Sequence, residues 1–328
     1  MTFQPERAMD FAVRHTTYVI FAAVLIWYGV QAPSFLMPES LANIAKQSSF
    51  IGIAAIGMTF VLLTGGIDLS VGSVMFLAPL IAGYAMRELG VPVPVGFAVA
   101  LGAGLAMGLI NAVFIVWLRV IPFIVTLATL FLFRGFGTWL TSSTAFDFKE
   151  DFRAFGLSSF AGIPIPILIF ATVALLAHVA LAHTTFGRQV YALGNDREAA
   201  RKAGVNVRLV EMKVYVICSA CAALAGFVLI AQIGRLDAGF GEGREFDVIA
   251  AAVLGGASLF GGVGSAFGAV VGATLIQTVK LGLVFTGVNL YLQPMMQGAI
   301  IIVAVLADGV REKRMQALQK RTIRSLSG

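Results

Sequence analysis

The two cysteines of this sequence are the first candidates for chemistry, because they form a Cys-x-x-Cys pair at Cys218 and Cys221. A redox or metal role would need accessible thiolates and further ligands. The pair instead lies inside the apolar run 214–230. We therefore interpret both cysteines as small, polarizable packing residues.

Motifs for hydrolysis or nucleotide binding are also missing. The glycine spacing at Gly52 and Gly57 matches a phosphate-binding loop, but the lysine that would contact phosphate is absent and the stretch is apolar. Neither Gly-x-Ser-x-Gly nor His-Glu-x-x-His occurs, and each of the three histidines, His15, His178 and His183, is isolated from any such motif. The sequence therefore predicts no catalytic residue, no metal site and no cofactor.

One carboxylate lies between two apolar stretches, in the block 64–72 (TGGIDLSVG). The paired glycines interrupt the first helix, and Ser70 can cap the next one. Broken helices in membranes often line a polar path. The block therefore predicts either part of a translocation path or gate, or a helix cap at the membrane interface. The candidate path or gate residues are Thr64, Gly65, Gly66, Asp68 and Ser70, with Asn43, Lys46 and Asn111 in nearby apolar runs.

Composition identifies the elements that must position these residues. The 328 residues are 59% hydrophobic and 12% charged, with a mean hydropathy of +0.91. Apolar stretches of spanning length recur along the chain, and only helices or closed barrels satisfy the backbone in lipid. The stretches are too long for barrel strands. We therefore expect an all-α, polytopic helical bundle in a membrane.

About ten spans can be assigned by length. Basic residues are concentrated in the loop 183–213 and the tail 308–328, whereas acidic residues balance or exceed the basic ones in 141–163 and 232–247. Because basic loops stay cytoplasmic, the net charge of +6 indicates orientation rather than nucleic-acid binding. We expect both termini inside, a cytoplasmic segment 1–15, a permease domain 16–307 and a basic cytoplasmic tail. The expected spans are near 16–31, 41–63, 70–86, 93–118, 121–140, 164–182, 209–231, 246–259, 265–285 and 289–307.

The run 246–260 is short for a span, and its length alone favours a re-entrant loop. The basic tail must nevertheless return to the cytoplasm, which needs an even number of crossings after the loop 183–213. We therefore predict that this run crosses the membrane.

Glycines recur at small-x-x-x-small spacing, which lets helices approach closely in a membrane. The pairs Gly104–Gly108 and Gly268–Gly272 follow this pattern, so we predict that they pack against neighbouring helices. Gly261 and Gly262 predict either a tight turn or a hinge, and the sequence does not separate the two.

A short charged helix is predicted at 195–204, between two membrane-type stretches. Asn195 is the expected N-cap, Glu198 the capping-box partner and Gly204 the left-handed end. Lipid cannot solvate or hydrogen-bond these charged side chains, so the helix is expected to bind a soluble partner. The expected coupling residues are Asn195, Asp196, Arg197, Glu198, Ala199, Ala200, Arg201 and Gly204.

Three blocks, 64–72, 187–204 (beginning GRQVYALGN) and 246–262 (FDVIAAAVLGGASLFGG), resemble the permease subunits of bacterial ATP-binding-cassette (ABC) importers for monosaccharides, of the ribose, xylose and rhamnose type. The likeness covers nearly the whole chain. Glu198-Ala199-Ala200 with Gly204 resembles the loop that docks on the ATPase, although the Leu-Pro that often ends that loop is absent.

The resemblance implies a transport subunit in the bacterial inner membrane, without ATPase activity of its own. Its implied partners are an ABC ATPase subunit, a second permease subunit (the same or a different chain), a periplasmic sugar-binding protein and a sugar, with no nucleic acid. Alternating access would follow from ATP binding to the ATPase. The alternatives are a secondary transporter driven by an ion gradient, with Asp68 and Lys46 as coupling groups, and an ABC permease for branched-chain amino acids.

Overall fold

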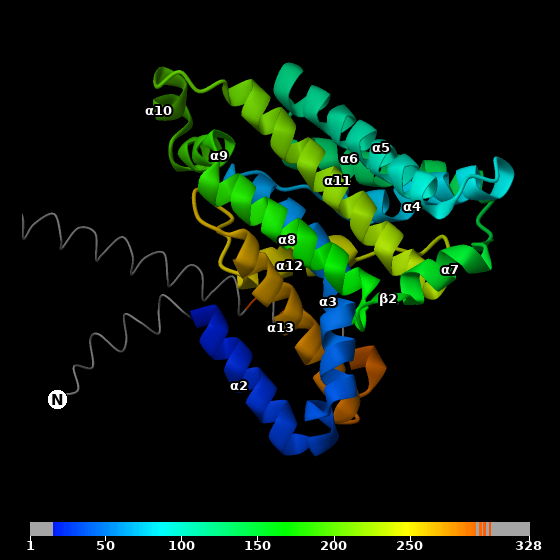
Figure 1. Cartoon of the computed structure of the whole chain (residues 1–328). Coiled ribbons are helices and arrows are strands. Elements are labelled where there is room, and N and C mark those ends of the chain that lie inside the picture. The colour runs from blue at the N-terminus through cyan, green and yellow to red at the C-terminus, as the bar shows by residue number, and fades with distance from the viewer. Residues whose placement is uncertain (1–15, 293–294, 297, 300–301, 303–328) are drawn as a thin grey trace, which may run out of the picture.

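The computed structural model describes residues 16–292, 295–296, 298–299 and 302 (Figure 1). This part of the chain is mostly helical, as the composition predicts. Two pairs of two-residue strands also form, β1 (Phe146–Asp147) with β4 (Arg235–Leu236) and β2 (Ser159–Phe160) with β3 (Ile163–Pro164). The α-helices are α2 (Thr16–Gln31), α3 (Pro38–Leu63), α4 (Val71–Glu88), α5 (Val93–Ala112), α6 (Pro122–Leu140), α7 (Glu150–Leu157), α8 (Ile165–His183), α9 (Thr185–Asn195), α10 (Arg197–Lys202), α11 (Val207–Ile233), α12 (Arg244–Leu254) and α13 (Ala266–Phe285).

Helix α11 is the centre of the bundle and packs against α3, α4 and α5 (Figure 1). The crossing with α5 depends on glycine: a Cβ on Gly108 would lie 2.7 Å from the Cα of Val216, and one on Gly104 would lie 2.8 Å from the carbonyl oxygen of Ser219. Close approach of backbones compensates for the missing hydrophobic drive in lipid. The packing prediction for Gly104 and Gly108 is therefore confirmed.

Close backbone contacts at glycines also join α12 to α13. A Cβ on Gly268 would collide with the carbonyl oxygen of Gly255, and one on Gly272 would collide with that of Ala251. Cys218 and Cys221 lie where α11 passes Gly57 of α3, with the Cβ of Cys221 only 2.6 Å from the position of a Gly57 Cβ. Both thiols are free, and the packing interpretation of the cysteines is confirmed.

Six helices of the described part are long and apolar enough to cross a membrane. Helix α2 is apolar but shorter, and the last expected span, 289–307, falls largely outside the described residues. The prediction of a polytopic helical bundle is thus confirmed in its coarse form, whereas a total of ten spans and the orientation of the termini stay predictions. The six helices are α3, the α5 helix continued to Trp117 by a π-helical turn (Val113–Trp117), α6, α8, α11 and α13.

Helices α4 and α12 both begin inside the bundle. The segment 64–70 joins α3 to α4 and passes the first third of α11, because a Cβ on Gly66 would collide with the hydroxyl group of Tyr215. The first turn of α4 then meets the start of α12, where a Cβ on Gly72 would lie 2.5 Å from the carbonyl oxygen of Gly241. Two helix N-termini therefore face each other in the interior, as in discontinuous transmembrane helices.

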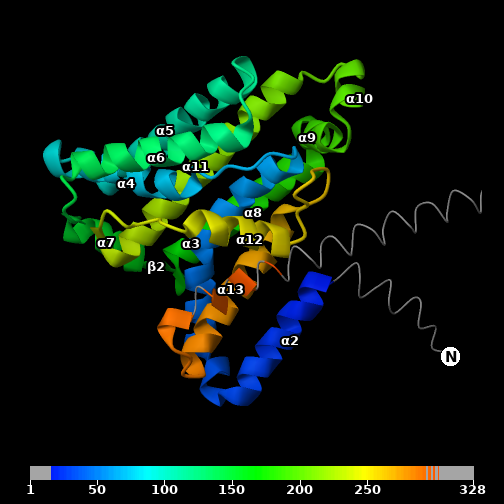
Figure 2. The same cartoon turned by 180° about the vertical axis from the view of Figure 1, so that it is seen from behind.

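The chain between α11 and α13 runs the length of α11. Leu236 pairs with Phe146 near the Ile233 end, and the backbone N–H of Gly262 donates to the carbonyl oxygen of Leu63 at the other end. Seen from behind, α12 lies against α3 and α13 along this route (Figure 2). The helix itself covers only 11 residues, roughly 16 Å, so loops complete the passage. The expected span near 246–259 is therefore helical only up to Leu254, and its crossing of the membrane stays a prediction.

Candidate functional site

Helices α9 and α10 form a small charged unit at one end of α11 (Figure 1). Sequence reasoning missed α9, which begins at the capping residue Thr184, whose hydroxyl accepts from the backbone N–H of Gly187 at 3.2 Å. Its apolar side chains Val190 and Leu193 are buried. Helix α10 is polar, and only Ala200 of its residues is buried.

The ends of α10 differ in part from the prediction. Asn195 is the last residue of α9, and Asp196 is the N-cap: its Oδ1 accepts from the backbone N–H groups of Glu198 (2.9 Å) and Ala199 (3.0 Å). The assignment of Asn195 as N-cap is therefore wrong. Glu198 does not close a capping box either, because its carboxylate pairs with Arg201 at 2.9 Å. The predicted left-handed end is confirmed, since Gly204 has φ = +85°.

A charged tether holds α10 to the bundle. The guanidinium group of Arg197 donates to both carboxylate oxygens of Glu211 in α11, with Nη2 2.9 Å from Oε2. Bidentate arginine–carboxylate pairs fix orientation as well as distance. The buried side of this pair belongs to Glu211 on the central helix, so movement of α10 must either move α11 or break the pair.

Three backbone segments meet where α9 ends, at a site that we call the glycine junction: Leu63, Gly65, Gly194, Gly261 and Gly262. The N–H of Gly262 donates to the carbonyl oxygen of Leu63 at 2.9 Å. A Cβ on Gly194 would collide with that same oxygen, and one on Gly261 would lie 3.0 Å from the carbonyl oxygen of Gly194.

Tyr191 of α9 adds a bond beside the junction, donating its hydroxyl hydrogen to the carbonyl oxygen of Gly264 at 2.8 Å. Burial raises the pKa of the Tyr191 phenol, so the group stays protonated and remains a donor. Gly261 and Gly262 have φ of +94° and +74°. Of the two alternatives for this pair, a tight turn or a hinge, the structure shows a tight turn. The three sequence blocks singled out above are thus in contact.

A buried polar network connects the 64–70 segment to α5 and α6. Asp68 Oδ1 accepts from the backbone N–H (2.9 Å) and hydroxyl (2.6 Å) of Ser70. The amide of Asn111 donates to the Ser70 hydroxyl oxygen at 2.9 Å, and the hydroxyl of Thr129 donates to the amide oxygen of Asn111 at 2.7 Å. Asp68, Ser70 and Asn111 have no exposed surface. We call Asp68, Ser70, Asn111 and Thr129 the polar network.

Ser70 occupies the N-cap position of α4, but its side chain makes no cap hydrogen bond, so the prediction of a side-chain cap is wrong. Within the described part of the chain, Oδ2 of Asp68 and the hydroxyl group of Tyr215 lack hydrogen-bond partners. Both groups are buried: the Tyr215 hydroxyl lies beside Gly66, and the Asp68 carboxylate lies beside Cys218. A movement that separates the 64–70 segment from α11 would give these groups access to new partners.

The predicted path residues fall into separate places. Asp68, Ser70 and Asn111 lie together, whereas Thr64 donates its hydroxyl to the carbonyl oxygen of Val61 at the end of α3. Lys46 and Asn43 lie near the opposite end of α3, where Asn43 is exposed. Sequence reasoning missed Tyr215 and Thr129, because a single polar residue in an apolar span has no spacing pattern that marks it.

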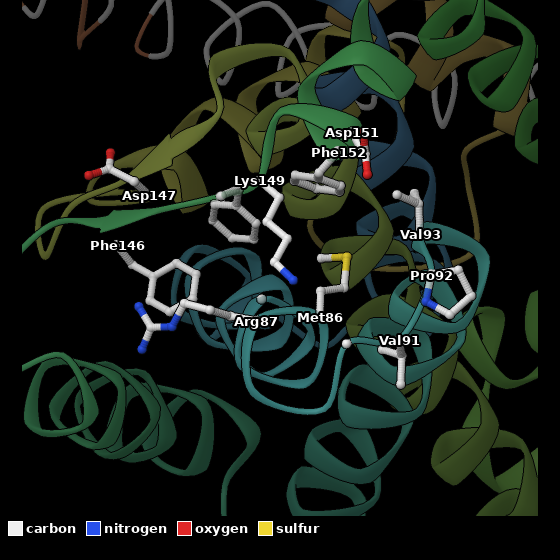
Figure 3. Close-up of a pocket in the computed structure, with 13 residues that line it drawn as sticks. Met86, Arg87, Val91, Pro92, Val93, Phe146, Asp147, Lys149, Asp151 and Phe152 are labelled. Carbon is white, nitrogen blue, oxygen red and sulfur yellow. The ribbon is translucent and has the colours of Figure 1, made fainter.

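A pocket of about 250 Å³ lies at the end of the bundle opposite α10, between the end of α4, the start of α5 and the segment 146–152 (Figure 3). Charged side chains of both signs line it, including Arg87, Asp147, Lys149 and Asp151. The guanidinium group of Arg87 lies over the Phe146 ring, 4.3 Å from its centre. The pocket has the mixed charge of a hydrated protein surface.

Residues 40–305 match the family model described as "Branched-chain amino acid transport system / permease component". The chain is 39% identical to the ribose import permease of Escherichia coli K12, over 86% of this chain and 89% of the relative. It is 33% identical to the D-allose transport system permease of the same strain, over 94% and 96%, and 30% identical to the xylose transport system permease of Haemophilus influenzae, over 90% and 96%. No solved structure matches the chain. The chain therefore belongs to this family of transport-system permease components.

Proposed function

We propose that this chain is the membrane permease subunit of an ABC importer that carries a sugar across the bacterial inner membrane. One observation carries the proposal: the exposed helix α10 adjoins the glycine junction, where the ends of α3 and α9 and the loop after α12 touch through their backbones. An ATPase bound at α10 could therefore move the helices that surround a translocation path. The names of the relatives support a sugar rather than a branched-chain amino acid.

The coupling step follows from the geometry. ATP-driven closure of the ATPase subunits would displace α9 and α10 as a unit, because Asp196 caps α10 directly behind the last residue of α9. The displacement would reach α3 through Leu63, the segment before α13 through Gly261 and Gly262, and α11 through the Arg197–Glu211 pair. Coupling through packed elements with discrete arrangements is the physical basis of such transmission.

The remaining partners would bind at the two ends of the bundle, one on each side of the membrane. The α10 end, with the basic loop 183–213, would face the cytoplasm and the ATPase. The opposite end, which holds the pocket of Figure 3, would face the periplasm and receive a sugar-binding protein. A second permease subunit would complete the path. Both termini would be cytoplasmic, with about ten crossings in all.

The proposal is tested by reconstitution. Liposomes that contain this chain and the ABC ATPase encoded beside it should take up sugar, delivered by the binding protein, only when ATP is inside. Uptake driven by an ion gradient without any ATPase would overturn the proposal and favour a secondary transporter.

We predict that Glu198→Lys and Gly204→Pro each abolish ATP-driven uptake while membrane insertion stays normal. A lysine in the first turn of α10 is unfavourable beside the positive end of the helix dipole. It would also repel Arg201, which forms an ion pair with the native Glu198. Proline cannot adopt φ = +85° at residue 204. Co-purification of the ATPase subunit and uptake are the measurements.

Glu150→Lys is the matched control, because Glu150 also lies exposed in the first turn of a helix, α7, at the other end of the bundle. This variant should retain the ATPase subunit. If Glu198→Lys and Gly204→Pro bind the ATPase and transport at the wild-type rate, the coupling assignment is wrong.

Topology gives a second prediction. In a background with Cys218 and Cys221 replaced, a cysteine at Gly239 should react with a membrane-impermeant thiol reagent on intact cells, because this exposed loop follows the Ile233 end of α11. A cysteine at Ser325 in the basic tail should not react until the cells are opened. Labelling of the Ser325 variant from outside would contradict both the crossing between α11 and α13 and the even number of spans.

A further inference from the structure

A second hollow, of about 430 Å³, lies beside the N-terminal half of α3. Helices α3, α7, α11, α12 and α13 all contribute to it, so it is built by segments far apart in the sequence. Its volume falls in the range of small-molecule sites, roughly 300–1,000 Å³. Its lining residues are Lys46, Gln47, Phe50, Leu157, Leu229, Gln232, Ile233, Arg244 and Gln277.

Three glutamine amides line this hollow, and lipid could not satisfy them. Gln277 is 8% exposed and makes no hydrogen bond to the described part of the chain. Gln47 is likewise without a bond among the described residues, whereas Gln232 donates to the carbonyl oxygen of Val228 at 3.2 Å. The amides of Gln47 and Gln277 therefore have donors and acceptors that an occupant of the hollow can use.

The charge of the hollow is positive. Lys46 and Arg244 line it, and none of the described lining residues is acidic. Lys46 has no ion pair with the described residues. Arg244 is 3.7 Å from Oδ2 of Asp247, but that oxygen already accepts from Lys280 at 2.6 Å. Lys46 can therefore bind an anion, and Arg244 has guanidinium N–H donors besides the one that faces Asp247.

An aromatic ring completes the lining. Phe50 is buried, and the guanidinium group of Arg244 lies 5.3 Å from the centre of its ring. A cation–π contact of this kind holds the arginine in place without using its hydrogen-bond donors. The hollow thus presents cationic donors, one of them held by a buried aromatic ring, and amides that can both donate and accept.

We propose that this hollow binds a sugar acid, a monosaccharide that carries a carboxylate group, on its way through the membrane. The carboxylate would lie against Lys46 and Arg244, and the hydroxyl groups would bond with Gln47 and Gln277. The proposal rests on the proposed function and narrows its substrate from sugars in general to acidic sugars.

Equilibrium binding of radiolabelled D-gluconate and D-glucose to the full chain in phosphatidylcholine nanodiscs tests this assignment. Gluconate should bind at least tenfold more tightly than glucose, a difference of about 1.4 kcal/mol. Lys46→Gln should remove this preference and leave glucose binding unchanged, whereas Gln277→Leu should weaken both. Lys149→Gln, which removes a lysine from the pocket at the end of the bundle, is the matched control and should change neither.

Equal binding of the two sugars, or gluconate binding that survives Lys46→Gln, would overturn the sugar-acid assignment. Loss of gluconate binding when anionic phosphatidylglycerol is added to the nanodiscs would also overturn it, because the hollow would then be a lipid headgroup site. ATP-driven uptake of a neutral sugar in the reconstituted system would still support the proposed function in each case, so the two failures are distinguishable. Monodisperse elution of each variant in detergent verifies its fold.

Discussion

Replacement of Gly194 with alanine is expected to reduce ATP-driven uptake at least tenfold. The new methyl group would collide with the carbonyl oxygen of Leu63 and lie 2.5 Å from the backbone nitrogen of Gly262. Both neighbours are backbone atoms, so neither can yield by changing a rotamer. Overpacking of this kind typically costs about 1–3 kcal/mol, and here it would push apart the segments of the glycine junction.

The matched control is Gly102→Ala, because Gly102 also lies in a helix but has open space where a Cβ would be. This variant should transport like the wild type. Uptake assays with both variants should be accompanied by ATPase rates, since a damaged junction should leave the ATPase bound but poorly coupled. Wild-type uptake by Gly194→Ala would show that the close contact at Gly194 does not transmit the movement.

The glycine junction also explains why a permease would keep glycine at these positions. Side chains would separate the three backbones by several ångströms and allow each to move independently. Direct backbone contact leaves no flexible side chain between the end of α9 and the helices that it would displace in the proposed coupling. Interiors packed without gaps transmit small shifts instead of absorbing them.

Hydropathy was sufficient to locate most helices, because spanning length and apolar composition are local properties. The glycine faces of α5 and α13 were also predictable, since their spacing follows the helix period. The end of α10 was predictable from Gly204, but its start was not: Asn195 and Asp196 are adjacent and either can cap a helix, and only the backbone geometry selects Asp196.

Contacts between distant segments could not be predicted from one sequence. The meeting of Leu63, Gly194 and Gly262 depends on the way in which three blocks fold around α11. The depth at which α4 and α12 begin was equally hidden, because hydropathy measures the length of an apolar run and not its position along the membrane normal. Tyr215 lies within an apolar stretch and gave no sign that it faces Gly66.

Asp68 gives the sharpest distinction between an ATP-driven permease and a transporter driven by ions. In the polar network its Oδ1 accepts two hydrogen bonds from Ser70, and an asparagine amide oxygen can accept both. We therefore expect Asp68→Asn to keep uptake within about threefold of the wild type. Asp68→Ala leaves the buried N–H and hydroxyl of Ser70 without this acceptor, an effect of about 1–3 kcal/mol, and should reduce uptake at least tenfold.

Asp237→Ala, in an exposed loop, is the control for loss of an aspartate and should leave uptake unchanged. If Asp68 instead carried a coupling proton or cation, asparagine would be as harmful as alanine, because neither can change its charge. Uptake should therefore be measured for both variants with ATP and, separately, with an imposed ion gradient. Equal loss in Asp68→Asn and Asp68→Ala, with gradient-driven uptake in the wild type, would contradict a structural role for the polar network. Retention by Asp68→Asn alone would mean that the carboxylate acts as a hydrogen-bond acceptor that holds the 64–70 segment to α5 and α6, and that the energy for transport enters elsewhere, at α10.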